Sequence, residues 1–449
     1  MVKPINSSDL KQFQADFNKV PASNVIKNSV ANNGIFKSSE TMKSKIAMDP
    51  TFSIDLTTGP VANQKQSGLC WVFAALNTLR HPMQNAFKVK GFELSEAYML
   101  FWDKLEKSNY FYENVIDTAN LPIGDRKIDF LMTTPQQDGG QWDMVCALFQ
   151  KYGVVPKSVM PDTASRTNSA ELNQVLNLKL RKDAVELRKL VNSADVTEKE
   201  VEAKKEEMLS QVYRILVYTV GEPPTKFDWS YRDDDKKFHE EHDITPQEFF
   251  KKYIDLDLPS FISTINAPTK DKPYNHVYTV ELLGNVVGGR QVRHLNLDLD
   301  TFKAMAVKQL KAGQVVWFGS DVVKMSDRKL GIMDTDVYDL DGLFDIDLSM
   351  SKADALDYAE SMMDHAMVLT GVDLDSEGKP TKWKVENSWG EKVGTKGYFV
   401  MSDAWFDKYV YQLVIQKKFL SEDLQKVYDK EKDEPHVLAP WDPMGALAK

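Results

Sequence analysis

The chain has 449 residues, which is long enough for a substantial core and for two or three domains. Its formal net charge of −10 disfavours nonspecific binding to the phosphates of nucleic acids. No apolar segment approaches the length of a membrane span, and residues 1–8 lack the apolar segment of a signal peptide, so we expect a cytoplasmic protein without membrane contact.

Residues 1–50 are predicted to form an N-terminal arm. Ser8 and Asp9 are suited to capping a short helix that carries Phe13 and Phe17. The sequence that follows is polar and rich in Asn and Lys, which is typical of a connecting segment. We therefore expect this region to lie outside the main core.

Residues 51–168 are predicted to form a mostly helical unit. After Cys70, apolar residues recur at helical spacing, which predicts a helix that begins at this cysteine. Further helices are predicted from residue 94 onward and over residues 142–152. Gly139 and Gly140 precede the last of these, where they form either an ordinary turn or a place at which a ligand can approach the backbone closely.

Residues 169–260 are predicted to form an inserted helical subdomain. Leu172, Val175 and Leu176 begin a helical pattern, and residues 196–208 continue it as a capped helix with charges of alternating sign. The charge run by itself indicates a solvated helix face.

Residues 261–420 are predicted to be rich in β-strands. The candidate strands share a high content of β-branched and aromatic residues, and they lie at residues 276–283, 315–320, 365–372, 381–387 and 397–401. This arrangement places His365 and Asn387 in a sheet-containing half and Cys70 in a helical half. We expect a cleft between the two halves.

Residues 421–449 are predicted to form a charged helix followed by an arm. The prolines of the last segment prevent a regular helix there. Trp441, Met444 and Leu447 are too apolar to be left in water, so we expect them to anchor an extended arm on a surface.

Cys70, His365 and Asn387 occur in the order that a thiol nucleophile requires. A free cysteine is only partly ionised at neutral pH, so a nucleophilic cysteine needs a cationic partner and benefits from a helix N-terminus. His365 would supply the imidazolium, and Asn387 would orient it through a hydrogen bond. The pattern predicts hydrolysis through a Cys-His-Asn site.

Four elements of the sequence resemble the papain-like cysteine peptidases. They are Gln64 six residues before the nucleophile, the Cys70-Trp71 pair, the distant His365, and the Asn-Ser-Trp-Gly run at residues 387–390. The resemblance implies an α+β, two-lobed fold, with a helical lobe, a β-barrel-like sheet lobe, an inserted helical hook and a C-terminal arm.

The same resemblance implies roles for further residues. The Gln64 side chain and the Cys70 N–H would form the oxyanion hole. Gly139, Gly140 and Trp389 would form part of the substrate-binding side. The two glycines would pair with the extended backbone of a peptide substrate, and Trp389 would also cover the bond between His365 and Asn387. No metal or organic cofactor is implied.

Three segments narrow the resemblance to the bleomycin hydrolase and aminopeptidase C family, namely residues 63–74, 138–142 and 438–448. Membership implies a cytoplasmic aminopeptidase that acts on peptides, with possible related activity on small amides or thiolactones. It also implies a homohexameric ring joined by the hook, and a C-terminal tail that lies in the cleft. Lys449 extends beyond the family-like ending, so we predict that it is trimmed and that Ala448 then supplies the gating carboxylate.

Two alternatives stay open at this point. One is a papain-like endopeptidase with an open cleft. The other is a ring-forming protein that binds nucleic acid or peptides and hydrolyses them only incidentally; nucleic-acid binding is compatible with a local basic patch but is not favoured by the net charge.

The remaining cysteine and the histidines carry simpler interpretations. Cys146 lies among apolar residues, which favours a buried thiol. With only two cysteines, the chain suits a reducing compartment. The seven histidines are scattered, and the close pair His239 and His242 lacks the spacing of a zinc helix, so no metal site is predicted.

Overall fold

The computed structural model describes residues 3–56, 59–254 and 256–448. Its helices are α1 (Ser7–Lys19), α2 (Ser23–Asn33), α3 (Ile35–Ser39), α4 (Met42–Ala47), α5 (Cys70–Phe87), α6 (Glu96–Asp117), α7 (Arg126–Thr133), α8 (Trp142–Tyr152), α9 (Ala164–Thr167), α10 (Ala170–Val191), α11 (Glu198–Val220), α12 (Pro246–Tyr253), α13 (Leu299–Lys311), α14 (Leu340–Phe344), α15 (Lys352–Asp357), α16 (Asp403–Tyr409) and α17 (Glu422–Glu431), with 3-10 helices η1 (Leu258–Ser260), η2 (Lys417–Phe419) and η3 (Pro443–Ala448). Its strands are β1 (Ile54–Asp55), β2 (Phe227–Arg232), β3 (Phe238–Ile244), β4 (Phe261–Ile265), β5 (Val277–Val280), β6 (His294–Asn296), β7 (Val316–Ser320), β8 (Ser326–Asp327), β9 (Ile332–Met333), β10 (His365–Leu374), β11 (Pro380–Glu386), β12 (Tyr398–Ser402), β13 (Val410–Gln416) and β14 (His436–Leu438). Among the described residues, no helix combines the length and the apolar character needed to cross a membrane.

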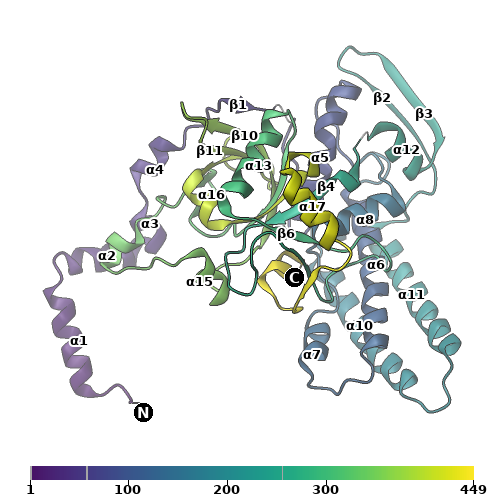
Figure 1. Cartoon of the computed structure of the whole chain (residues 1–449), viewed down its shortest axis with the longest axis horizontal. Coiled ribbons are helices and arrows are strands. Elements are labelled where there is room, and N and C mark those ends of the chain that lie inside the picture. The colour runs from purple at the N-terminus through teal and green to yellow at the C-terminus, as the bar shows by residue number, and fades with distance from the viewer. Residues whose placement is uncertain (1–2, 57–58, 255, 449) are drawn as a thin grey trace.

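The N-terminal arm extends away from the sheet (Figure 1). It contains the four helices α1 to α4, whereas the sequence predicted one short helix and a connecting segment. The N-cap of α1 is Asn6 and not the predicted Ser8 or Asp9. The Asn6 side chain accepts the N–H groups of Ser8 and Asp9, and the Asp9 carboxylate accepts the Asn6 N–H in return. The predicted apolar residues Phe13 and Phe17 remain exposed.

A large mixed sheet forms the centre of the molecule. Within the described residues it has twelve strands in the order β14-β5-β6-β4-β13-β7-β10-β11-β12-β9-β8, with β1 paired to β10. Helix α5 packs against β7 and β10, and α13 packs against β7, β10 and β13. The α+β class predicted from the sequence is therefore confirmed.

Strand β10 shows why the sheet is apolar on both faces. Ala366 and Val368 belong to the core that contains α5, whereas Met367 and Leu369 belong to the core that contains α13. Successive strand residues point to opposite faces, so a strand between two cores needs a nearly continuous apolar run. Strand β4, which is buried throughout, and strand β13, which is buried except at its last residue, were not predicted and lie next to each other in this sheet.

The inserted region combines the predicted helices with an unpredicted hairpin. Helices α10 and α11 pack on each other and on α6, and they project together from the body (Figure 1). Thr197 caps α11 in a capping box with Glu200, as the sequence predicted. Strands β2 and β3 form a separate two-stranded sheet, held to the body by Trp229, whose ring lies 5.4 Å from that of Phe87.

A buried ion pair joins α5 to β11. Arg80 Nη2 lies 2.5 Å from Glu386 Oε1, and both side chains are almost completely buried. Arg80 Nη1 also donates to the carbonyl of Pro60 at 2.9 Å. Because Glu386 is the last residue of β11 and precedes Asn387, this pair fixes the helix that begins at Cys70 against the strand that leads to Asn387.

We expect Arg80→Met to destabilise the fold by about 3–5 kcal/mol, because it removes the cation from a buried ion pair and leaves the negative charge of Glu386 uncompensated by Arg80. Equilibrium urea unfolding followed by tryptophan fluorescence measures the loss. The double substitution Arg80→Met with Glu386→Leu should recover much of it, and Lys182→Met, in the exposed pair Lys182–Glu186, should have no measurable effect. Equal stability of Arg80→Met and the wild type would contradict a structural role for the pair.

Candidate active site

Cys70 is the first residue of α5, which agrees with the helix predicted from the sequence. The preceding residue, Leu69, makes no side-chain cap, so a side chain does not take the first-turn N–H groups. These groups carry the positive end of the helix dipole and favour an anionic sulfur. The backbone N–H of Ala366 also hydrogen-bonds to the thiol, which places the sulfur beside the start of β10.

His365 and Asn387 lie on neighbouring antiparallel strands. His365 is the first residue of β10, and Asn387 follows directly after β11. His365 Nε2 lies 2.9 Å from Asn387 Oδ1. Because the amide oxygen only accepts, Nε2 carries the hydrogen and Nδ1 is left as the basic nitrogen of the neutral ring. The structure thus brings together the histidine and asparagine that the sequence predicted.

Trp389 covers the histidine ring. The two ring centroids are 4.9 Å apart, with an angle of 31° between the planes. The guanidinium carbon of Arg328 lies over the Trp389 ring, 4.2 Å from its centroid. The indole therefore lies over the imidazole that bonds to Asn387, as the sequence predicted.

Burial acts in opposite directions on the thiol and the imidazole. It raises the pKa of Cys70 to about 12 and lowers the pKa of His365 to about 4, although the bond to Asn387 works against the second shift. In both cases burial disfavours the charged form of the group, because a single charge loses its contact with water. Proton transfer from sulfur to imidazole creates two opposite charges together, and their attraction and the α5 dipole offset that penalty.

Gln64 lies in the loop that leads to Cys70, and three hydrogen bonds fix its position. Its backbone N–H donates to the Ser388 carbonyl at 2.8 Å, and its Oε1 accepts from Ser388 Oγ at 2.5 Å. Its Nε2 donates to the Ser67 carbonyl at 2.7 Å. An amide nitrogen has two hydrogens, so this bond leaves a second one for an oxyanion.

The glycine pair packs closely against the nucleophile helix. A Cβ atom on Gly140 would lie 2.5 Å from the Trp71 ring, so a larger residue does not fit there without movement. The Gly139 carbonyl accepts a hydrogen bond from Lys107 Nζ at 2.6 Å. Trp71 Nε1 donates to the carbonyl of Asp138, the residue before the pair, at 2.7 Å.

Asp138 is a functional candidate that the sequence did not identify by itself. Its carboxylate accepts from Gly68 N at 2.8 Å, from Asn173 Nδ2 at 2.9 Å and from the Ser169 hydroxyl. Burial opposes the charge, yet Lys104 at 2.8 Å and these donors hold the pKa of Asp138 well below its usual range. The motif at residues 138–142 was visible in the sequence, but no spacing rule revealed these partners.

The C-terminal tail packs beside the glycine pair. The Met444 carbonyl accepts from Gln141 Nε2 at 3.3 Å, and the side chains of Met444 and Leu447 are buried as predicted. Strand β14 and the 3-10 helix η3 replace the fully extended arm that the sequence predicted. The backbone of Ala448 ends η3, and Lys449 lies outside the described residues.

Comparison with known proteins identifies the family. Residues 4–445 match the model of the Peptidase C1-like family. Aminopeptidase C of Lactobacillus helveticus is 60% identical over 100% of this chain and 99% of its own, and aminopeptidase C of Streptococcus thermophilus is 56% identical over 97% of each. The chain belongs to the Peptidase C1-like family.

A solved relative has the same fold as this Peptidase C1-like protein. The crystal structure of PepW from Lactobacillus rhamnosis HN001 has 64% sequence identity and a TM-score of 0.98, covering 99% of this chain and all of the other. The prediction of a papain-like cysteine peptidase in the aminopeptidase C group is therefore confirmed.

The two cysteines should differ strongly in reactivity. Cys146 is completely buried, and burial raises its thiol pKa to about 12. Cys70 begins helix α5 and lies beside Ala366, the residue that follows His365. We expect iodoacetamide at neutral pH to label Cys70 in the native protein, and to label Cys146 only after unfolding. Peptide mass spectrometry distinguishes the sites, and native labelling of Cys146 in preference to Cys70 would overturn the assignment of the nucleophile.

Proposed function

We propose that this protein is a cytoplasmic cysteine aminopeptidase that removes N-terminal residues from peptides through Cys70, His365 and Asn387. The observation that carries the proposal is the position of Cys70 at the start of α5, beside β10, where His365 is already bonded to Asn387. The names of the aminopeptidase C relatives support the substrate class. The two free, buried thiols support a reducing compartment.

In this mechanism the Cys70 thiolate attacks the carbonyl carbon of the scissile amide. His365 gives its proton to the amine nitrogen, the C–N bond breaks, and a thioester to Cys70 remains. His365 then removes a proton from water, which attacks the thioester and releases the acid and the thiol. Small amides and thiolactones pass through the same acyl intermediate, so we include them as further candidate substrates.

The oxyanion of each tetrahedral intermediate would be held by Gln64 and the Cys70 N–H. The bonds from Gln64 to Ser67 and Ser388 support this role, because they fix the amide before a substrate arrives. Gly139 and Gly140 would pair with the substrate backbone. The absence of a side chain on Gly140 leaves Trp71 in contact with the backbone there.

The C-terminal tail would restrict the enzyme to free N-termini. Its contact with Gln141, directly after the glycine pair, supports a position on the substrate-binding side. A terminal carboxylate there would attract the protonated α-amino group of a peptide and leave no room for residues before it. Trimming of Lys449 would make Ala448 the terminal residue. An endopeptidase with an open cleft is the alternative that this tail disfavours.

We also propose that the chain assembles into a homohexameric ring. Apolar side chains on the N-terminal arm support assembly, because Leu10, Phe13 and Val25 are more than half exposed. The net charge of −10 gives no support to nucleic acid as a partner.

Substitutions at the site test the chemistry. Cys70→Ala should abolish release of a fluorophore from an aminoacyl-arylamide while leaving the thermal unfolding profile intact. Gln64→Ala should lower kcat about 10²–10³-fold with little change in substrate affinity, because the oxyanion exists only along the reaction path. Cys146→Ala serves as the control and should keep most of the activity. Full activity of Cys70→Ala would refute the mechanism.

Multi-angle light scattering tests the assembly. We expect a species near six times 51.1 kDa for the full chain. Removal of residues 1–47, which carry the exposed apolar side chains of α1 to α4, should shift the mass downward because the apolar contacts are lost. A fully active monomer at micromolar concentration would exclude the ring as a requirement for catalysis.

Deletion of residues 444–449 tests the gate. We expect the shortened enzyme to cleave N-terminally blocked peptides that the full chain leaves intact, because the carboxylate and its steric barrier are gone. Paired assays on a blocked and an unblocked version of one peptide give the ratio. Intact mass should also fall by one lysine in the active protein and stay at full length in Cys70→Ala. A truncated enzyme that remains strictly an aminopeptidase would show that the tail is not the gate.

A further inference from the structure

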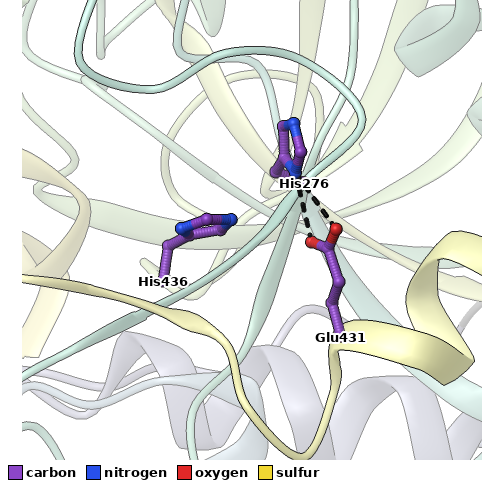
Figure 2. Close-up of side chains that lie close together, drawn as sticks. All are labelled: His276, Glu431 and His436. Carbon is purple, nitrogen blue, oxygen red and sulfur yellow. Dashed lines mark hydrogen bonds and ion pairs between the residues drawn. The ribbon is translucent and has the colours of Figure 1, made fainter.

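Two histidines and a glutamate converge far from Cys70 in the sequence, on the edge of the sheet where β14 pairs with β5. The residues are His276, just before β5, Glu431 at the end of α17, and His436 at the start of β14 (Figure 2). One ligand atom from each side chain lies within 4.8 Å of the others. This cluster was not predicted from the sequence, because 155 residues separate His276 from Glu431.

The parallel pairing of β14 and β5 creates the cluster. His436 stands opposite Tyr278 in the register, so the imidazole of β14 arrives beside the start of β5. The rings of His276 and His436 are 5.1 Å apart and nearly perpendicular, at 89°. The two imidazole rings therefore approach edge to face, and the His436 ring also lies 5.5 Å from the Tyr278 ring.

The distances match the requirements of a transition-metal ion. Zn²⁺ forms bonds of about 2.0–2.2 Å to nitrogen and oxygen, so two ligands of a tetrahedral site lie about 3.3–3.5 Å apart. His276 Nδ1 already lies 3.1 Å and 3.3 Å from the two Glu431 oxygens. The exposed His436 side chain offers the third ligand atom, which lies within 4.8 Å of the other two.

The Glu431 carboxylate also accepts a hydrogen bond from a group that is not itself a candidate ligand, as in many metal sites. Val277 N donates to Glu431 Oε2 at 2.9 Å, which fixes the orientation of the carboxylate before an ion binds. Two imidazoles and one carboxylate form a donor set that suits Zn²⁺ and Co²⁺ better than Mg²⁺ or Ca²⁺, which prefer oxygen ligands throughout.

We propose that His276, Glu431 and His436 bind one divalent transition-metal ion of the Zn²⁺ or Co²⁺ type, and that this ion fastens the base of the C-terminal tail to β5. The three ligands come from α17, from β14 and from the residue before β5. One ion would therefore connect α17 and β14, which precede the end of the tail, to β5. The site is separate from the Cys-His-Asn constellation and does not depend on the proposed peptidase activity.

The test uses full-length Cys70→Ala protein throughout, because a thiol beside His365 is itself a ligand for Zn²⁺. Isothermal titration calorimetry with Zn²⁺ should give one ion per chain. His276→Gln and His436→Gln, each added singly, should weaken binding at least about tenfold. His242→Gln is the matched control, because His242 is also a surface histidine next to acidic groups, and it should leave binding unchanged. Absence of binding, or binding that neither ligand substitution weakens, would overturn the site.

Hydrogen exchange tests the consequence for the tail. Zn²⁺ should slow the exchange of the amides in residues 436–438 of the Cys70→Ala protein, because the ion opposes separation of β14 from β5. The same addition should have no effect on these amides in the His436→Gln protein. Zn²⁺ binding at the cluster with unchanged exchange in β14 would overturn the fastening of the tail.

Discussion

The ion pair between Arg80 and Glu386 is the contact on which the geometry of the candidate site depends. Apolar packing holds α5 against the sheet, but such packing is non-directional and allows a helix to slide or rotate. The guanidinium has a fixed planar shape and meets one carboxylate oxygen and one carbonyl. It therefore fixes the helix of Cys70 relative to the strand that ends next to Asn387.

Asp138 imposes a second constraint on the side of the site where a substrate would lie. One carboxylate binds the nucleophile loop at Gly68, the start of the insertion at Ser169 and Asn173, and helix α6 through Lys104. Gly68 lies in a loop outside the helices and strands, whereas Lys104 and Asn173 lie in the long helices α6 and α10, so the carboxylate ties the loop to well-packed elements. A buried, fully bonded charge supplies the order that packing does not, because leaving any of these donors unpaired would be costly.

Local signals in the sequence were enough to identify the residues of the candidate site, since Gln64, Cys70 and residues 387–390 lie in short motifs and the helix at Cys70 has clear periodicity. Contacts between distant segments were not predictable in this way. Asp138 reaches Lys104 and Asn173 only after folding, and His276 meets His436 only through a strand pairing. The helices α2 to α4 were missed because their composition is polar, and propensity alone is a weak guide for such segments.

Because the thiol and the imidazole are buried, the contacts that fix their positions affect the charges that the two groups can carry. Each group on its own is held neutral in this site, since burial raises the pKa of Cys70 to about 12 and lowers that of His365 to about 4. Only a joint event, in which the proton moves from sulfur to nitrogen, avoids an isolated buried charge. Such a pair is stabilised only at close range and with fixed dipoles, because attraction between charges weakens with distance. The contacts that fix α5 against β11, and Asn387 against His365, are therefore part of the chemistry and not only of the fold.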